Sequence, residues 1–259
     1  MCGTPGHPGM IELLLIGIGT GDPDHLTGQA IKALNRADLV LIPRKGSAKA
    51  DLADLRRDLC QRFLTQPARL VEYDLPVREA GNPDYGDGVN DWHDAIAATH
   101  AALIRAHLGR SGSVALLVWG DPSLYDSSLR IADRLRAQGM ALAVEVVPGL
   151  TSLQLLTAAH AIPLNTLGEP FLVTTGRQLR ESGMPEGIKT VVVMLDGENS
   201  FATLDPAGIR VYWGAFLGMP NQILLAGPLA DTGPQIVARR AAARAEHGWI
   251  MDIYLLRCA

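Results

Sequence analysis

The feature that most constrains this fold is a regular alternation of short apolar runs with longer amphipathic segments over the first 150 residues. The apolar runs are rich in Val, Ile and Leu, as in strands buried on both faces. The segments between them repeat apolar residues at helical spacing. The predicted strands are 11–18, 39–42, 70–73, 114–119 and 143–147, and the predicted helices are 26–35, 51–64, 92–108 and 127–138. This alternation predicts a parallel sheet with helices on both faces.

Two breaks in this pattern are predicted from local composition. Pro43 is expected to end the strand 39–42, because proline cannot donate to a ladder. Residues 76–90 are rich in Pro, Gly, Asn and Asp and are expected to form a loop.

The pattern changes after Pro148 and Gly149. One helix is predicted over 151–159, and few helices interrupt the strands that follow. These strands are 171–174, 190–195, 211–215, 222–225 and 249–256. Such a strand-rich half predicts a mixed sheet and therefore a second α/β domain. We expect domains at 10–150 and 151–259, with residues before Met10 as a tail.

Composition excludes several classes of protein. The formal net charge of −4 argues against a general nucleic-acid binder. The chain has no apolar run of the roughly 20 residues that a membrane span needs, and its start does not resemble a signal peptide. Its cysteines, Cys2, Cys60 and Cys258, have no metal-ligand spacing, so no metal is expected. These features predict a cytoplasmic protein.

A glycine-rich loop follows the first predicted strand, from Gly17 to Asp22. A dinucleotide-binding fingerprint would place its third glycine where Asp22 stands, and an acid there would repel a pyrophosphate. This loop therefore argues against a nicotinamide cofactor. Taken alone, it is equally consistent with a tight turn that needs positive φ angles.

Two further turns follow predicted parallel strands, where open α/β sheets bind ligands. At Gly120–Tyr125 the glycine would allow close backbone approach, and Asp121 could accept hydrogen bonds from a ligand or simply cap the turn. At Pro148–Ser152, Thr151 or Ser152 could cap the next helix or bind a ligand.

Together these turns carry a resemblance to the tetrapyrrole methylase family. The family pattern joins a G-x-G-x-G-D loop, an A-D-x-V…P second strand, a G-D-P-x-x-Y loop and a P-G-x-[ST]-[SA] turn. The matching segments are Gly17–Asp22, Ala37–Pro43, Gly120–Tyr125 and Pro148–Ser152. Segments 41–46, 49–57, 88–93, 175–177 and 195–197 are most similar to the branch of the family that removes an acetyl group from a corrin precursor.

The resemblance implies two α/β domains with a cleft between them that holds S-adenosylmethionine, which leaves as S-adenosylhomocysteine. The residues implied as cofactor contacts are Pro43, Trp119, Gly120, Asp121, Tyr125, Thr151, Ser152, Leu195, Gln222 and Pro228. The Gly17–Asp22 loop would face the macrocycle, which makes Gly19 and Gly21 candidate substrate-binding residues.

A basic run follows the second predicted strand. Its members are Arg44, Lys45, Lys49, Arg56 and Arg57. The run is consistent either with a solvated face or with recognition of the carboxylates on a corrin precursor. Arg44 and Lys45 are the candidate substrate-binding residues, because they follow Pro43 directly.

His93, His100 and His107 recur every seven residues, which puts them near one face of a helix. We expect exposed side chains here, with His93 beside Trp92 nearest the substrate. Loss of an acetyl group would need a water and a base. The candidate catalytic residues are Asp22, His93 and Asp196.

The resemblance thus implies a homodimeric C-methyltransferase of cobalamin biosynthesis, and the composition implies a cytoplasmic location without nucleic acid or membrane as a partner. One alternative is another methylase of the family, acting on a different precorrin, on uroporphyrinogen, or on a protein or RNA. A second alternative is a tetrapyrrole or nucleotide carrier without catalysis. Release of S-adenosylhomocysteine on mixing with a substrate would distinguish an enzyme from a carrier.

Overall fold

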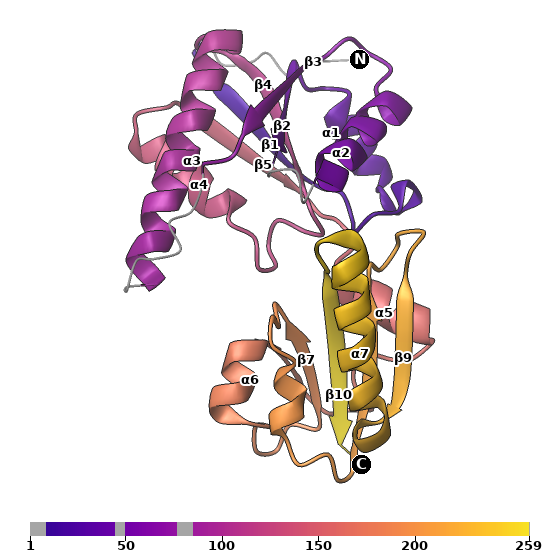
Figure 1. Ribbon diagram of the computed structural model, residues 1–259. Helices are drawn as coiled ribbons and strands as arrows, with labels where there is room; N and C mark the ends of the chain where they lie inside the picture. Colours follow the sequence, from indigo (N-terminus) through magenta and orange to yellow (C-terminus); the bar gives the residue numbers. More distant parts are fainter. Residues whose placement is uncertain (1–8, 45–49, 77–84, 259) are drawn as a thin grey trace. The chain divides into compact units, whose positions relative to one another are not determined.

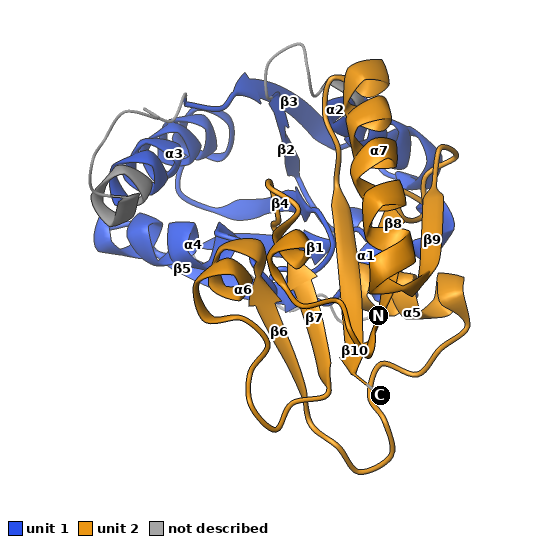
Figure 2. Cartoon of the chain, turned by 60° about the horizontal axis from the view of Figure 1, so that its bottom comes forward, with its two compact units in different colours: residues 1–19, 23–150 blue, residues 20–22, 151–259 orange. Residues whose placement is uncertain are grey.

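The computed structural model describes residues 9–44, 50–76 and 85–258, and it divides into two compact units (Figures 1 and 2). Unit 1 comprises Met1–Gly19 and Pro23–Leu150. Unit 2 comprises Thr151–Ala259 together with the short segment Thr20–Asp22. The chain therefore passes from one unit to the other at three points. Lys45 and Lys49, both part of the predicted basic run, lie outside the described residues.

Unit 1 is built on a parallel sheet in the order β3-β2-β4-β1-β5. Its strands are β1 (Ile11–Gly17), β2 (Leu39–Arg44), β3 (Arg69–Asp74), β4 (Gly112–Val118) and β5 (Leu142–Val147). The three strands at the centre of the sheet are almost fully buried, as their continuous apolar sequences predict.

Helices cover both faces of this sheet (Figure 1). One face packs against α1 (Gly28–Leu34) and α2 (Ala50–Phe63), which follow a short 3-10 turn, η1 (Pro23–His25). The opposite face packs against α3 (Tyr85–Leu108) and α4 (Ser128–Ala137). The loops that leave β2 and β4 therefore lead to opposite faces.

Two local predictions in unit 1 were wrong. Pro43 lies inside β2 rather than after it. The carbonyls of Asp38 and Arg44 accept hydrogen bonds from β3, so by alternation the nitrogen of Pro43 faces β4. Pairing between β2 and β4 has already ended at Leu41, so no N–H is needed there.

The second error concerns the predicted loop 76–90, because α3 begins at Tyr85. The sequence pattern does not predict the first turn and a half of α3, because that segment contains poor helix formers, including Gly86 and Gly88. Packing of the long helix against α4 outweighs that local preference.

Unit 2 is built on a mixed sheet in the order β6-β7-β10-β8-β9. Its strands are β6 (Phe171–Thr175), β7 (Thr190–Met194), β8 (Ile209–Ala215), β9 (Ile223–Pro228) and β10 (Asp252–Cys258). β6 and β7 are parallel, whereas β10 pairs antiparallel with both β7 and β8. The two predicted sheets, parallel and mixed, are confirmed.

Three helices and a 3-10 turn complete unit 2. α5 (Ser152–His160) packs against β8 and β10, and α7 (Leu229–His247) packs against β8 and β9. α6 (Gly176–Ser182) contacts η3 (Ser200–Thr203). The largest fully buried side chains here are Trp213, Tyr254 and Phe216.

Candidate functional site

Three glycine turns meet at the carboxyl ends of the unit 1 strands. A Cβ atom on Gly149 would lie 2.2 Å from the carbonyl oxygen of Gly120, and one on Gly17 would lie 2.6 Å from the nitrogen of Gly149. Gly19 and Gly120 are joined by a β-bridge in which the Gly120 N–H donates to the Gly19 oxygen at 2.8 Å. The parts of the three family motifs that belong to unit 1 are therefore in direct backbone contact, through Gly17, Gly19, Gly120 and Gly149.

The carboxylate of Asp121 joins two of these turns. Oδ2 accepts from the Gly149 N–H at 2.9 Å, and Oδ1 accepts from the Ser123 N–H at 2.8 Å. Burial alone raises the pKa of Asp121, but hydrogen bonds from Ser123 and Gly149 outweigh burial and lower it. Only 8% of the residue is exposed, so the carboxylate holds the two turns together from inside.

Two exposed residues in the predicted cofactor set have strained backbones. Tyr125 has φ 49° and is 46% exposed, and Leu195 has φ 53° and is 67% exposed. Residues with a side chain rarely adopt this left-handed region, at a cost of roughly 1–3 kcal/mol, and such strain clusters at ligand sites. An apolar side chain held outward at this cost supports a ligand contact at Leu195.

A buried network holds the residue after Leu195. The Asp196 carboxylate accepts from Tyr254 Oη at 2.7 Å, from Ser200 N and Oγ at 2.6 and 2.8 Å, and from Glu198 N at 3.0 Å. The carbonyl of Asp196 accepts from Arg240, which also pairs with Asp252 at 2.8 Å. Burial raises the pKa of Asp196, but these hydrogen bonds outweigh burial and lower it. The Asp196 carboxylate thus fixes the backbone directly after Leu195, and its oxygens are occupied by these hydrogen bonds.

The start of α5 presents two hydroxyl groups. Thr151 is the N-cap, and its Oγ1 accepts from the Leu153 N–H at 3.2 Å in a capping box with Gln154. Ser152 is half-buried, and within the described ranges no hydrogen bond involves its hydroxyl. Ser152 is therefore the hydroxyl better placed to bind a ligand.

The register of the unit 2 sheet separates Pro228 from two other predicted cofactor contacts, Leu195 and Gln222. Gln222 directly precedes β9, and the first residue of that strand, Ile223, pairs with Ala215; Ala215 in turn pairs with Asp252. This register puts Gln222 and Leu195 at the same end of the sheet, measured along the strands. Pro228 pairs with Arg210 at the opposite end of the same strands. It lies about five residues along β9 from Ile223, or roughly 17 Å. The structure therefore does not bring Pro228 together with Leu195 and Gln222.

The glycine loop is divided between the two units. Gly19 belongs to unit 1, whereas Gly21 packs against Met219 of unit 2. Between them, Thr20 Oγ1 donates to the Leu217 carbonyl at 2.7 Å. Asp22 is half-buried at the end of this segment.

The basic run does not form one solvated face. Arg44 pairs with Asp74 at 3.0 Å, and Arg57 pairs with Glu72 at 2.7 Å. Arg56, in contrast, is only 9% exposed. Helix α2 turns Arg56 toward the sheet and Arg57 toward solvent, because successive residues on a helix point in different directions.

The expectation of exposed histidines on α3 was wrong. His93 and His100 are 4% and 3% exposed, because this face of the helix packs against the sheet and α4. His93 Nε2 lies 2.8 Å from Ser127 Oγ, and His100 Nε2 lies 2.6 Å from Tyr73 Oη. His107 is half-buried near Arg69. Sequence spacing alone cannot reveal which face of a helix is covered.

We expect acid to destabilise unit 1 through His100. Burial lowers the pKa of His100 to about 4, whereas the pKa of a histidine in an unfolded chain is about 6.5. Between these values the unfolded chain binds a proton that the folded chain does not. Stability should therefore fall with falling pH, by up to about 1.4 kcal/mol per unit. Urea unfolding from pH 7 to 4.5 should show a shallower slope in His100→Gln, and equal slopes would contradict this.

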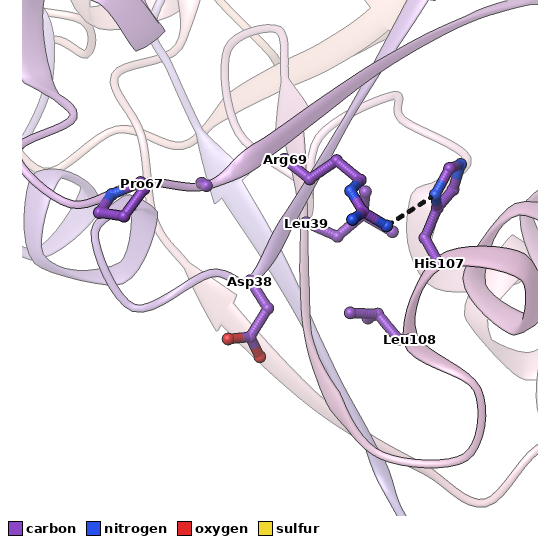
Figure 3. A pocket seen from close by; sticks show the side chains of 7 residues that line it. Asp38, Leu39, Pro67, Arg69, His107 and Leu108 are labelled. Atoms are coloured by element: carbon purple, nitrogen blue, oxygen red, sulfur yellow. Dashed lines mark hydrogen bonds between the residues drawn. The ribbon is translucent and has the colours of Figure 1, made fainter.

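A groove of about 450 Å³ lies at the amino ends of β2 and β3, opposite the end of the unit 1 sheet where the three glycine turns meet (Figure 3). Figure 3 shows Arg69 turned toward His107, with 3.2 Å between Arg69 Nη1 and His107 Nδ1. The lining residues are Asp38, Leu39, Pro67, Ala68, Arg69, His107 and Leu108. None of the predicted site residues is among them.

Two other features are absent from the described residues. No helix there is long and apolar enough to cross a bilayer. No cluster of three or more His, Cys, Asp or Glu side chains there could hold a metal ion.

Comparison with known proteins identifies the family. The model of the tetrapyrrole (corrin/porphyrin) methylases matches residues 12–233. A precorrin-6A synthase [deacetylating] from Sinorhizobium sp is 51% identical over 251 residues, which cover 96% of each chain. A solved structure of a cobalamin synthesis related protein (CobF) from Corynebacterium diphtheriae is 38% identical, with a TM-score of 0.81 over 96% of this chain and 98% of that one.

A more distant structure shares the fold. It is uroporphyrin-III C-methyltransferase from Thermus thermophilus, solved with S-adenosyl homocysteine, at 20% identity and a TM-score of 0.57 over 95% of this chain and 92% of that one. The family model covers most of the chain, and it includes the three turns that meet in unit 1. The chain therefore belongs to the tetrapyrrole methylase family and is an S-adenosylmethionine-dependent methyltransferase.

Proposed function

We propose that this chain transfers a methyl group from S-adenosylmethionine to C-1 of precorrin-5 and releases acetate, giving precorrin-6A. The observation that carries the proposal is the 51% identity to the Sinorhizobium precorrin-6A synthase over 96% of both chains. By contrast, a precorrin-2 C(20)-methyltransferase is 32% identical over 60% of each chain. The resemblance to the family further supports a homodimer, and the composition supports a cytoplasmic location.

We propose that the cofactor is held by residues with room for a ligand. A Cβ atom on Gly120 would meet nothing within 4 Å, so a ligand can approach that turn closely. Tyr125 and Leu195 hold exposed side chains outward, and the Ser152 hydroxyl is available for a hydrogen bond. These properties fit a ligand with both an apolar ring and polar groups.

The bound sulfonium supplies an already activated methyl group, so the protein needs no nucleophile of its own for that step. The residues of the turns have to orient donor and acceptor and keep bulk water away. The rigid contacts among Gly17, Gly120 and Gly149 support such precise placement.

Release of acetate needs a second chemical step. Water adds to the acetyl carbonyl, the bond between that carbon and the ring breaks, and its electron pair enters the conjugated macrocycle, which later takes up a proton. A base must accept a proton from the water. Among the three candidates, His93 is buried and the acceptor sites of Asp196 are occupied. Asp22 is half-buried and ends the glycine loop that the family resemblance places against the macrocycle, so we assign it as the base.

Product analysis tests this proposal. With precorrin-5 and S-adenosylmethionine, we expect one methyl group gained, one acetyl group lost, and acetate equal in amount to S-adenosylhomocysteine. Mass spectrometry of the corrinoid and an acetate assay measure both. Asp22→Asn should slow acetate release about 100-fold or more, as expected for loss of a general base.

The two parts of the proposal fail separately. A methylated product that keeps its acetyl group with the unaltered protein would contradict the deacetylating activity. Normal acetate release by Asp22→Asn would contradict only the assignment of the base.

A further inference from the structure

Arg56 is a buried cation without an anionic partner among the described residues. It is 9% exposed, and every ion pair found there involves other side chains. Its Nε donates to the Leu117 carbonyl at 2.9 Å, and its Nη1 donates to the Leu52 carbonyl at 2.8 Å. Buried arginines are normally paired with carboxylates, so the missing partner needs an explanation.

Among the described residues, the groups around Arg56 do not supply that charge. Burial lowers the pKa of Arg56, and Tyr73 and Asp126 partly offset this. Burial raises the pKa of Tyr73, so its hydroxyl is neutral, and its partner His100 is neutral as well. Asp126 lies beyond ion-pair distance, and its Oδ1 accepts from the Ser128 N–H at 2.6 Å. A net positive charge therefore remains at the guanidinium.

Pro43 explains the bond to Leu117. Pairing of β2 with β4 ends at Leu41 and Leu116, so Leu117 would come next in register. The Val118 carbonyl accepts from β1, so by alternation the Leu117 carbonyl faces β2. β2 offers Pro43 there, which has no N–H, and Arg56 Nε donates in its place. Arg56 thus lies in the gap between the carboxyl ends of β2 and β4.

This gap is where a ligand of a parallel sheet is expected. The loops after β2 and β4 lead to helices on opposite faces, and such a divergence opens a crevice for ligands. Within the described part of the chain, Arg56 Nη2 makes no hydrogen bond. Unlike His93 Nδ1 and His100 Nδ1, it keeps some exposed surface. Nη2 is therefore not fully enclosed, although the side chain as a whole is buried.

We propose that Arg56 binds a carboxylate of a substrate, on the tetrapyrrole or on the amino-acid part of S-adenosylmethionine. The inference rests on the proposed function, because both molecules carry carboxylates. Of the two sequence candidates for this role, Arg44 already has Asp74 as a partner, and Lys45 lies outside the described residues. A guanidinium with unused donors in a nearly dry setting binds a carboxylate more strongly than an exposed, paired one does.

Calorimetric titration of Arg56→Gln tests the proposal with two probes. The first probe is a stable corrinoid polycarboxylate, and the second is S-adenosylhomocysteine. We expect the Kd of one probe to rise about 10- to 100-fold, the loss expected for a charge-assisted hydrogen bond. Arg57→Gln, an adjacent exposed arginine with partners of its own, should stay within about twofold of the unaltered protein.

The outcomes separate the sources of the carboxylate. A rise confined to the corrinoid assigns the macrocycle, and the same corrinoid with its acids converted to amides should then bind weakly and be insensitive to Arg56→Gln. A rise confined to S-adenosylhomocysteine assigns the cofactor. Unchanged affinity for both probes would overturn the inference. If the unaltered protein binds neither probe, the proposed function fails and the inference fails with it.

A second variant and a crystal structure test the proposal even if Arg56→Gln does not fold. Arg56→Lys keeps the charge but not the fork of donors, so it should recover part of the affinity. A crystal structure of the unaltered protein with the corrinoid should show a carboxylate oxygen about 2.7–2.9 Å from a guanidinium nitrogen of Arg56. A bound corrinoid or cofactor with no carboxylate there would contradict the proposal.

Discussion

Replacing Gly149 by alanine is expected to destabilise unit 1 strongly and to abolish binding of S-adenosylhomocysteine. The added Cβ would lie 2.2 Å from the Gly120 oxygen and 2.8 Å from the Gly17 Cα atom. All three atoms nearest to it are backbone, so no flexible side chain can move aside. Forcing extra volume into packed structure typically costs about 1–3 kcal/mol, and a rigid surrounding puts this change at or above the upper end.

Thermal unfolding and calorimetric titration measure the two effects of Gly149→Ala. At about 2–4 °C per kcal/mol, we expect the Tm to fall by roughly 6–12 °C. Gly28→Ala is the matched control, because Gly28 is exposed at the start of α1 and a Cβ there meets nothing within 4 Å. That variant should be as stable as the original chain or slightly more so. Unchanged stability and affinity in Gly149→Ala would show that the three turns can separate freely.

Replacing Asp196 by alanine is expected to have the largest effect in unit 2. The change removes the acceptor for Tyr254, Ser200 and Glu198, and it leaves the Tyr254 hydroxyl buried without that partner. Removing one member of a buried charged network costs about 3–5 kcal/mol. Leu195 should then relax out of its left-handed conformation, so affinity for S-adenosylhomocysteine should fall as well.

The control for this change is Asp205→Ala. Asp205 is exposed and accepts a single backbone hydrogen bond, from Ala207 at 3.0 Å. It should cost no more than about 1 kcal/mol. Chemical denaturation gives the free energies, and titration gives the affinities. If Asp196→Ala is destabilised but binds S-adenosylhomocysteine normally, Asp196 is structural and does not position a cofactor contact.

The central strands of unit 1 could be predicted because strands buried on both faces leave a continuous apolar signal. β1 has this signal from Leu13 onward and β4 from Val114 onward. The first turn of α3 could not be predicted, since its residues are poor helix formers and distant packing decides their conformation. Pro43 inside β2 was hidden for a similar reason, because proline is tolerated only where the neighbouring strand has diverged.

The turns of the candidate site could be predicted because each is a local motif that follows a strand. Their supporting contacts could not. Asp196 depends on Tyr254, 58 residues later, and Arg56 on the Leu117 carbonyl, 61 residues later. A basic run looks the same in sequence whether a side chain points to solvent or into a crevice. Burial and hydrogen-bond partners distinguish Arg56 from Arg57, and both depend on the tertiary fold.

The segment Thr20–Asp22 has a consequence for folding during synthesis. Thr20 leaves the ribosome early, but its hydrogen-bond partner, the Leu217 carbonyl, is 197 residues further along the chain. At about 5–20 residues per second, roughly 10–40 s pass before that partner exists. β1, directly before the segment, finds β4 and β5 much sooner. The nascent chain must therefore keep these three residues available while its first sheet assembles, and only then can unit 2 be completed around them.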